Sequence, residues 1–219
     1  DDEEAQEDEK LSDKAVSAIM SVAMVIGIVI AVGLFVILPK KLVPLIHPLT
    51  ANRILQSFAE GILKIILFIL YLSATLLMKD QRRTYEYHGA EHKTIACLEA
   101  GLELNVENVK KQRRFHPRCG TSFIFITLII SILVMCMVPF REPWLRVVSS
   151  LILLPVMVGI SYELIRIAGR YTNTFTRIIS APGLWIQRLT TREPDASQIE
   201  TAIAAIKPCI PENPEEDKW

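Results

Sequence analysis

The sequence predicts an all-α, polytopic membrane protein with about four transmembrane helices, a helical cytoplasmic loop and a C-terminal interfacial segment. First, the 219 residues are 51% hydrophobic and their mean hydropathy is +0.33, which excludes an intrinsically disordered chain. Second, four stretches approach the roughly 20 apolar residues that a helix needs to cross a bilayer. Third, the 24 basic and 24 acidic residues cancel overall, but they are concentrated in different parts of the chain.

The N-terminal segment is strongly acidic. Residues 1–13 hold eight of the acidic residues and one of the basic ones, so the remainder carries a net charge of +7. We expect a disordered acidic tail here, because the segment has too few apolar residues to order itself; a partner-binding arm is the alternative. The membrane domain is expected over residues 14–206. Because the sequence begins with Asp1 and not with methionine, we expect it to be a fragment.

The first two predicted spans are residues 15–38 and 54–78. The first has no charged residue, and its acidic approach and its length argue against a cleaved signal peptide. The second contains Lys64, with Glu60 four residues earlier, which puts both on one helix face. These two charges lie either in the interfacial turn of the span or in an ion pair that faces a cavity or a neighbouring helix.

Two further spans are expected at residues 121–140 and 145–168. The first of these has no charged residue, and the second is interrupted near its end by Glu163 and Arg166. Only four residues, 141–144, separate the two spans. The short connection predicts an antiparallel helix hairpin.

The C-terminal region continues with shorter elements. Residues 175–190 contain a Pro-Gly break at Pro182 and a tryptophan, which favour an interfacial or re-entrant segment over a span. Residues 197–206 have the pattern of a short amphipathic helix, which the following proline ends. We expect residues 207–219 to form a loose tail.

The distribution of lysine and arginine predicts the orientation. The loop 79–120 alone has nine basic residues, whereas the opposite side of the four spans has five. Since basic loops stay in the cytoplasm, both termini and this loop are expected to be cytoplasmic, and anionic membrane lipid is an expected partner. Nothing indicates nucleic-acid binding. The reducing cytoplasm also makes disulfides unexpected among the four cysteines, which are Cys97, Cys119, Cys136 and Cys209.

One motif in the cytoplasmic loop can carry chemistry. The sequence His88-Gly-Ala-Glu91-His92 lies in a stretch of helical composition, where residues four apart project side by side. Two imidazoles on one helical turn are a common pair of ligands for Zn²⁺, and Glu91 beside them is a candidate general base, as in the inverted zinc-protease pattern. The alternative is a surface helix with histidines exposed to solvent.

A zinc site needs three or four protein ligands, so the remaining ligands are expected on the same side of the membrane. His116 and Cys119 are three residues apart just before the third predicted span. Glu163 lies near the cytoplasmic end of the fourth, where an ionisable residue is expected to be functional or paired; Arg166 is its alternative partner. Glu99 shares the helix face of the two histidines, as a ligand or as a partner for imidazole N–H. A full set of four ligands suggests a structural site, and two histidines with one carboxylate suggest catalysis.

Several of these motifs together resemble a known family. Residues 87–94, 116–123, 161–163, 182–185 and 190–194 are similar to the YqhQ family of bacterial membrane proteins, which are described as a domain of unknown function and as predicted metal-dependent enzymes. The resemblance runs from about residue 11 to 206 and implies dependence on a metal. The family pattern begins with a further N-terminal part that is absent here. The resemblance supplies no substrate.

The leading hypothesis is therefore a multi-pass protein of the bacterial cell membrane with a divalent metal, expected to be Zn²⁺, at its cytoplasmic surface. His88 and His92 are the expected ligands, completed by His116, Cys119 or Glu163. The hypothesis includes hydrolysis of a peptide or a lipid-linked substrate. The rival hypothesis is a non-catalytic membrane module, whose polar or metal clamp supports binding to a membrane-protein partner such as an assembly factor or translocon.

Overall fold

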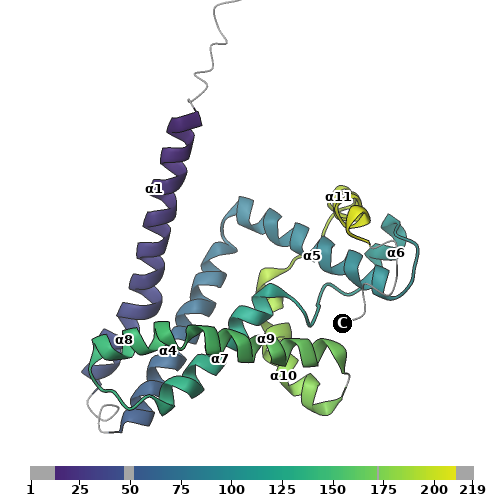
Figure 1. Cartoon of the computed structure of the whole chain (residues 1–219). Helices are drawn as coiled ribbons and strands as arrows, with labels where there is room; N and C mark the ends of the chain where they lie inside the picture. Colours follow the sequence, from purple (N-terminus) through teal and green to yellow (C-terminus); the bar gives the residue numbers. More distant parts are fainter. Residues whose placement is uncertain (1–12, 47–51, 172, 211–219) are drawn as a thin grey trace, which may run out of the picture.

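The structure is a computed structural model that describes residues 13–46, 52–171 and 173–210. Within these residues it consists of helices and their connections and has no β-strand, which confirms the all-α class (Figure 1). Three helices are long and apolar enough to cross a membrane, or four if one bent helix pair counts as a single span. The predicted acidic tail lies outside the described residues except for Asp13, where the first helix begins.

The helical elements follow one another with short connections. In chain order they are α1 (Asp13–Val32), η1 (Gly33–Ile37), α2 (Leu38–Leu42), η2 (Val43–Leu45), α4 (Arg53–Thr75), α5 (Lys79–Glu99), α6 (Val106–Lys110), α7 (Gly120–Met137), α8 (Pro143–Ile152), α9 (Leu154–Arg170), α10 (Thr174–Thr190), α11 (Ala196–Ile206) and η3 (Lys207–Cys209). The element η3 corrects the predicted start of the C-terminal tail. Residues 207–209 form a 3₁₀ turn, whereas a loose tail was expected from residue 207.

The first predicted span is part of one long apolar helix, Ala15–Leu42, made of α1, η1 and α2. Figure 1 shows α1 standing apart from the other helices, and its apolar side chains are exposed on every face. The long helix contacts the rest of the protein at its η1 segment, where the ring centroid of Phe35 lies 6.3 Å from that of Phe68 in α4. A helix that is apolar all round is expected to be covered by lipid or by another helix.

Helices α4, α7 and α10 pack against one another at the centre of the molecule. Their shared apolar cluster is formed by Leu72, Phe125 and Ile186, one residue from each helix. Gly61 lets α4 approach α7 closely, because a Cβ at this position would overlap the side chain of Ile132. Gly183 does the same for α10, where a Cβ would overlap Ser122 of α7.

A buried ion pair joins α4 to α8. Oε2 of Glu60 lies 3.0 Å from Nη2 of Arg146, and the two side chains are 4% and 2% exposed. The same guanidinium donates to the hydroxyl of Ser57 at 2.9 Å. Of the two interpretations of Glu60, the structure therefore favours an ion pair facing a neighbouring helix, but its partner is Arg146 and not Lys64.

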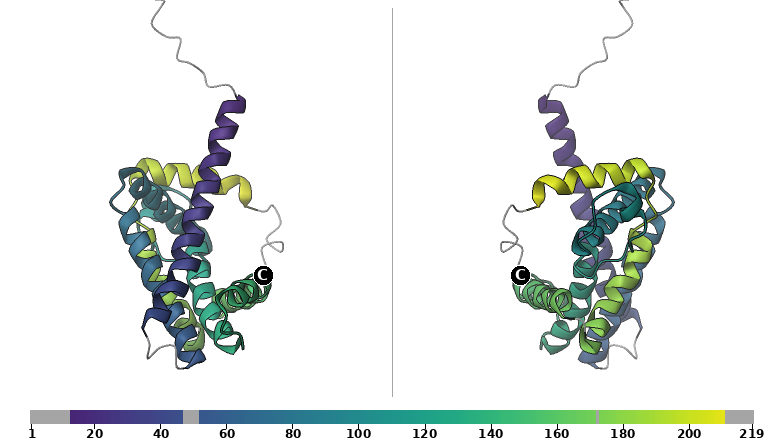
Figure 2. Two further views of the ribbon diagram at one scale, coloured as in Figure 1. Left: turned by 90° about the vertical axis from the view of Figure 1, so that its left-hand side faces the viewer. Right: turned by 90° about the vertical axis from the view of Figure 1, so that its right-hand side faces the viewer.

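The fourth predicted span, 145–168, is not one straight helix. It is divided into α8 and α9, which are bent by 50° relative to each other, and Figures 1 and 2 show α9 running across the direction of α1. Pro155, at the start of α9, lacks the N–H that would continue the hydrogen-bond ladder of α8, so the break has a local cause. The expected simple hairpin of two straight spans is therefore replaced by a broken pair.

The predicted cytoplasmic loop folds into a compact layer at one end of α4, α7 and α10 (Figure 1). Helix α5 covers most of the expected helical stretch, and α6 and α11 pack on it. The apolar core of this layer consists of Ala90, Cys97, Val109, Ile199 and Ile203. Helix α10 passes through Pro182 without interruption, although the sequence predicted a break there, and its last residue brings the chain back beside α5.

Candidate metal centre

Three of the predicted metal ligands meet beside α5. Ligand atoms of His88, His92 and Cys119 all lie within 4.8 Å of one another. The two histidines are one turn apart in α5, and Cys119 is the residue that precedes α7. His92 and Cys119 are 4% and 7% exposed, and His88 is partly buried. Two imidazoles and a thiol at this spacing match the donors that zinc prefers.

Backbone carbonyls hold both imidazole rings in a defined orientation. Nδ1 of His88 lies 2.8 Å from the carbonyl oxygen of Thr190, and Nδ1 of His92 lies 2.7 Å from that of Arg114. Each Nδ1 therefore donates its proton to a carbonyl, which leaves Nε2 as the nitrogen of each ring that can bind a metal. Nε2 of His88 is directed at the sulfur of Cys119, 3.2 Å away. This is the arrangement of histidines that bind a metal through Nε2, so the donor set fits a zinc-type ion.

Close packing at Gly89 places α5 against the segment that follows α10. A Cβ at Gly89 would overlap the carbonyl oxygen of Arg192, and the N–H of Arg192 donates to the carbonyl of Tyr85 at 2.8 Å. This contact puts the carbonyl of Thr190 within reach of His88. This packing contact therefore requires a glycine between the two histidines, which the sequence motif alone does not reveal.

Gln187 fixes the segment that carries Cys119. It accepts a hydrogen bond from the N–H of His116 at 2.8 Å and donates to the carbonyl of the same residue at 2.7 Å. It also donates to the hydroxyl of Ser122 at 2.7 Å. The fully buried amide of Gln187 therefore ties α10 to both sides of Cys119.

The neighbouring imidazoles change the acidity of the Cys119 thiol. Burial raises the pKa of Cys119, but hydrogen bonds with His88, His92 and Thr121 outweigh burial and lower the pKa to about 5. Burial also lowers the pKa of His88, whereas its hydrogen bond with Cys119 and the charge of that sulfur raise the pKa by more. Cys119 is thus a thiolate at neutral pH, which is the form that binds a metal.

His116 lies next to the cluster but has another partner. Its ring centroid is 5.9 Å from that of His92, and its Nε2 is 3.2 Å from Oε2 of Glu99. Glu99 also pairs with Arg118. His116 and Glu99 therefore form a polar border to the cluster and are not brought together with its three ligand atoms.

Glu91 and Glu163 lie away from the cluster. Glu91 is exposed and lines a crevice between α5 and α11 together with Thr201. Glu163 is 56% exposed and its carboxylate lies 3.5 Å from Arg166, the alternative partner considered for it. Neither carboxylate belongs to the group of ligand atoms that lie within 4.8 Å of one another.

Sequence reasoning missed the groups that orient the imidazoles. Backbone carbonyls, such as those of Thr190 and Arg114, leave no signature in a sequence pattern. Gln187 gave no signal either, because one glutamine in an amphipathic segment has many roles. The family resemblance at residues 190–194 was the one feature of the sequence that indicated a role for the segment after α10.

Comparisons with known proteins identify a family, and neither of the matching descriptions names an activity. The family described as "Protein of unknown function (DUF1385)" matches residues 2–212. "Uncharacterized protein YqhQ" of Bacillus subtilis (strain 168) is 38% identical over 202 residues, which are 90% of this chain and 63% of that protein. The chain thus spans less than two thirds of the length of this relative. No solved structure matches the chain.

Proposed function

The chain belongs to the DUF1385 family, and we propose that it is a bacterial cell-membrane protein with a zinc-type centre at the cytoplasmic surface. His88, His92 and Cys119 would hold the ion. The observation that carries the proposal is the convergence of three ligand atoms within 4.8 Å, with both Nδ1 atoms engaged by carbonyls. The ion would act as a Lewis acid toward a carbonyl or phosphoryl group.

Among the residues that the structure describes, three ligands converge, and this number supports hydrolysis as the reaction class. Catalytic zinc sites use three protein ligands and keep one position open, whereas structural sites are closed by four. A peptide or a lipid-linked molecule is the proposed substrate class, because the centre lies at the end of the apolar helices α4 and α7. Glu91 is the candidate base. Its charge acts on His88, but its side chain would have to turn away from α11 to reach the centre.

A specific observation also favours the non-catalytic alternative. The ligands and their carbonyl partners come from α5, from the segment before α7 and from the end of α10. An ion there would clamp the cytoplasmic layer to the membrane helices. In this case the basic cytoplasmic surface would serve to bind a membrane-protein partner, such as an assembly factor or translocon, and membrane lipid.

Metal analysis of purified variants tests the proposal. Wild-type protein should contain about one zinc per chain, and His92→Ala and Cys119→Ser should each lose it, because a three-ligand site cannot spare a donor. Cys209→Ser, at an exposed cysteine, is the matched control and should keep the metal. Metal-free wild-type protein would refute both versions of the centre.

A second pair of variants separates the two versions. If the centre is catalytic, Glu91→Gln should keep metal and stability and abolish the cellular phenotype of the wild-type gene. If Glu91→Gln is silent while His92→Ala lowers the unfolding temperature strongly, the clamp is correct. His116→Ala should retain the metal in both cases, because its ring is engaged by Glu99.

A further inference from the structure

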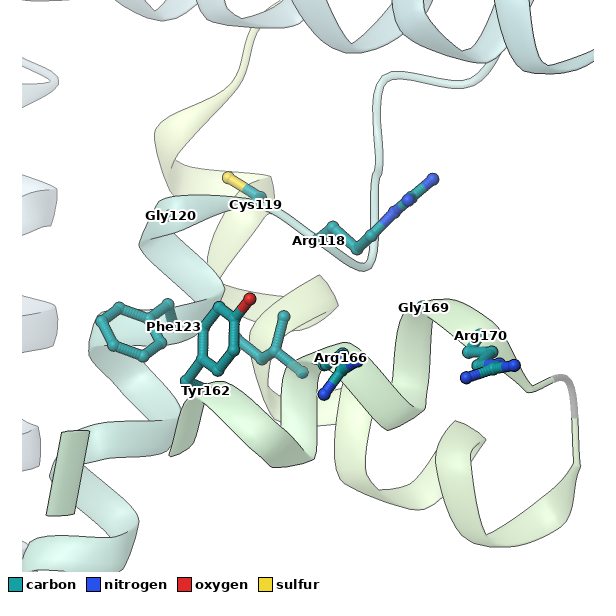
Figure 3. Close-up of a pocket in the computed structure, with 9 residues that line it drawn as sticks. Arg118, Cys119, Gly120, Phe123, Tyr162, Arg166, Gly169 and Arg170 are labelled. Carbon is teal, nitrogen blue, oxygen red and sulfur yellow. The ribbon is translucent and has the colours of Figure 1, made fainter. Parts of the chain in front are cut away.

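A cavity of about 430 Å³ adjoins the metal centre. It lies between the N-terminal end of α7 and the C-terminal half of α9 (Figure 3). Cys119 belongs to both sites: with Gly120 it forms the upper edge of the cavity, and its sulfur is turned away from the rings of Phe123 and Tyr162. The volume is within the range of sites for small molecules.

Three arginines line the cavity. Arg118 pairs with Glu99, and Arg166 lies 3.5 Å from the exposed carboxylate of Glu163. Arg170 has no carboxylate within ion-pair distance among the described residues, and its guanidinium lies 5.8 Å from the ring of Tyr171. Glu99 and Glu163 therefore neutralise two of the three arginines. The remaining positive charge makes the cavity favourable for an anion.

The polarity of the cavity changes along its length. Tyr162, Arg166 and Arg170 are four residues apart in α9, so they follow one face of the helix, as Figure 3 shows. Phe123 of α7 and Ile165 of α9 line the same cavity. Arg166 and Arg170 thus lie toward the end of α9, while the apolar side chains lie on helices that continue into the apolar, membrane-type part of the protein.

We infer that this cavity binds an anionic lipid whose headgroup ends in a phosphate group. Arg166 and Arg170 bind the phosphate, because a guanidinium offers paired donors that match phosphate oxygens. The first carbons of the lipid chains lie against Phe123 and Ile165. A soluble phosphate would use the arginines but not this apolar wall. The identification of the lipid as a substrate rests on the proposed function, whereas its binding does not.

Native mass spectrometry of the whole chain in detergent tests the binding. The probes are a palmitoyl-oleoyl phosphatidic acid, a phosphatidylcholine with the same chains, and inorganic phosphate as competitor. Phosphatidic acid should bind one to one and more tightly than phosphatidylcholine, and inorganic phosphate should displace it poorly. Arg166→Gln/Arg170→Gln should raise the Kd for phosphatidic acid at least about tenfold, since two charge-assisted contacts are lost. Arg170→Gln alone should give a smaller increase.

The control removes the same charge elsewhere. Arg82→Gln/Arg83→Gln changes two exposed arginines of α5 that do not line the cavity, and should leave the Kd nearly unchanged. Equal weakening by both double variants would overturn the inference, because binding would then depend on overall charge. Equal binding of the two lipids, or full competition by inorganic phosphate, would also overturn it.

Metal content in the same samples separates this inference from the proposed function. Binding of phosphatidic acid that depends on Arg166 and Arg170 in a protein without metal would reject the metal centre and keep the lipid site. A protein that contains zinc but binds the lipid independently of these arginines would keep the centre and reject the lipid site.

Discussion

At the scale of single residues, the neighbours of Cys119 decide its chemistry. An isolated thiol has its pKa near 9, whereas hydrogen bonds with two imidazoles and a hydroxyl lower the pKa of Cys119 to about 5 despite burial. The carbonyls of Thr190 and Arg114 matter as much, because they engage Nδ1 of each histidine and leave Nε2 to bind a metal. The donor set is therefore prepared before any ion arrives.

This acidity predicts a titration in the metal-free protein. As the pH rises through about 5, the Cys119 thiol loses its proton, so the ultraviolet absorbance of a thiolate should appear with a midpoint near pH 5. Cys119→Ser should remove this step, and Cys209→Ser should leave it intact. A wild-type protein whose thiolate absorbance begins only near pH 9 would show that the imidazoles do not act on the sulfur.

The types of residue in the candidate site were predictable, but their grouping was not. The spacing of His88 and His92 indicated a ligand pair, and Cys119 was one of several possible third ligands. What removed His116 from the group was a local partner, Glu99, at a distance that a sequence pattern does not encode. Glu163 was proposed for its depth in a span, and the exposed end of α9 instead leaves it beside Arg166.

At the scale of elements, the position of α5 against the end of α10 makes the site. Gly89 allows this contact because any Cβ there would meet the backbone of Arg192. A backbone atom cannot move aside as a side chain can. The glycine of the histidine motif is therefore a packing requirement, and the site depends on it indirectly.

Gly89→Ala tests this dependence. The added methyl group should force α5 away from residue 192, cost about 1–3 kcal/mol of stability, and lower the zinc content by displacing His88. Gly159→Ala in α9 is the matched control, because a Cβ there meets nothing within 4 Å; it should leave the zinc content unchanged and should not lower the stability, since alanine is favoured over glycine inside a helix. Thermal unfolding and metal analysis measure the effects. Unchanged zinc content and stability in Gly89→Ala would contradict the role given to this contact.

The apolar runs of the sequence predicted which segments are helical, but they did not predict how the helices bend and pack. The predicted boundaries 54–78 and 121–140 agree with α4 and α7 to within a few residues. The bend between α8 and α9 was missed because hydropathy does not register Pro155 in an apolar run. The partner of Glu60 was missed because Arg146 is 86 residues away, a separation that no local pattern encodes.

At the scale of the whole molecule, the apolar helices and the polar layer divide the protein into two regions. Helices α1, α4 and α7 supply the membrane-type segments, and α5, α6 and α11 form the layer that borders the metal centre (Figure 2). The basic residues of loop 79–120 belong to this layer. The charge distribution therefore predicts that the centre faces the cytoplasm.

Labelling with a membrane-impermeant maleimide tests this orientation. Cys209 is exposed on the side of the layer, so it should react only after the cells are permeabilised. Arg141→Cys, combined with Cys209→Ser, places an exposed thiol in the connection between α7 and α8 and should react on intact cells. The Cys209→Ser protein alone gives the background. Labelling of Cys209 on intact cells would reverse the predicted topology.

A zinc-edge X-ray absorption spectrum of the purified protein shows whether His88, His92 and Cys119 hold one zinc-type ion, as we propose. The predicted spectrum has one sulfur at about 2.3 Å and nitrogen neighbours at about 2.0–2.1 Å, and Cys119→Ser removes the sulfur contribution. A spectrum without sulfur in wild-type protein, or the same sulfur contribution in Cys119→Ser, would contradict the claim.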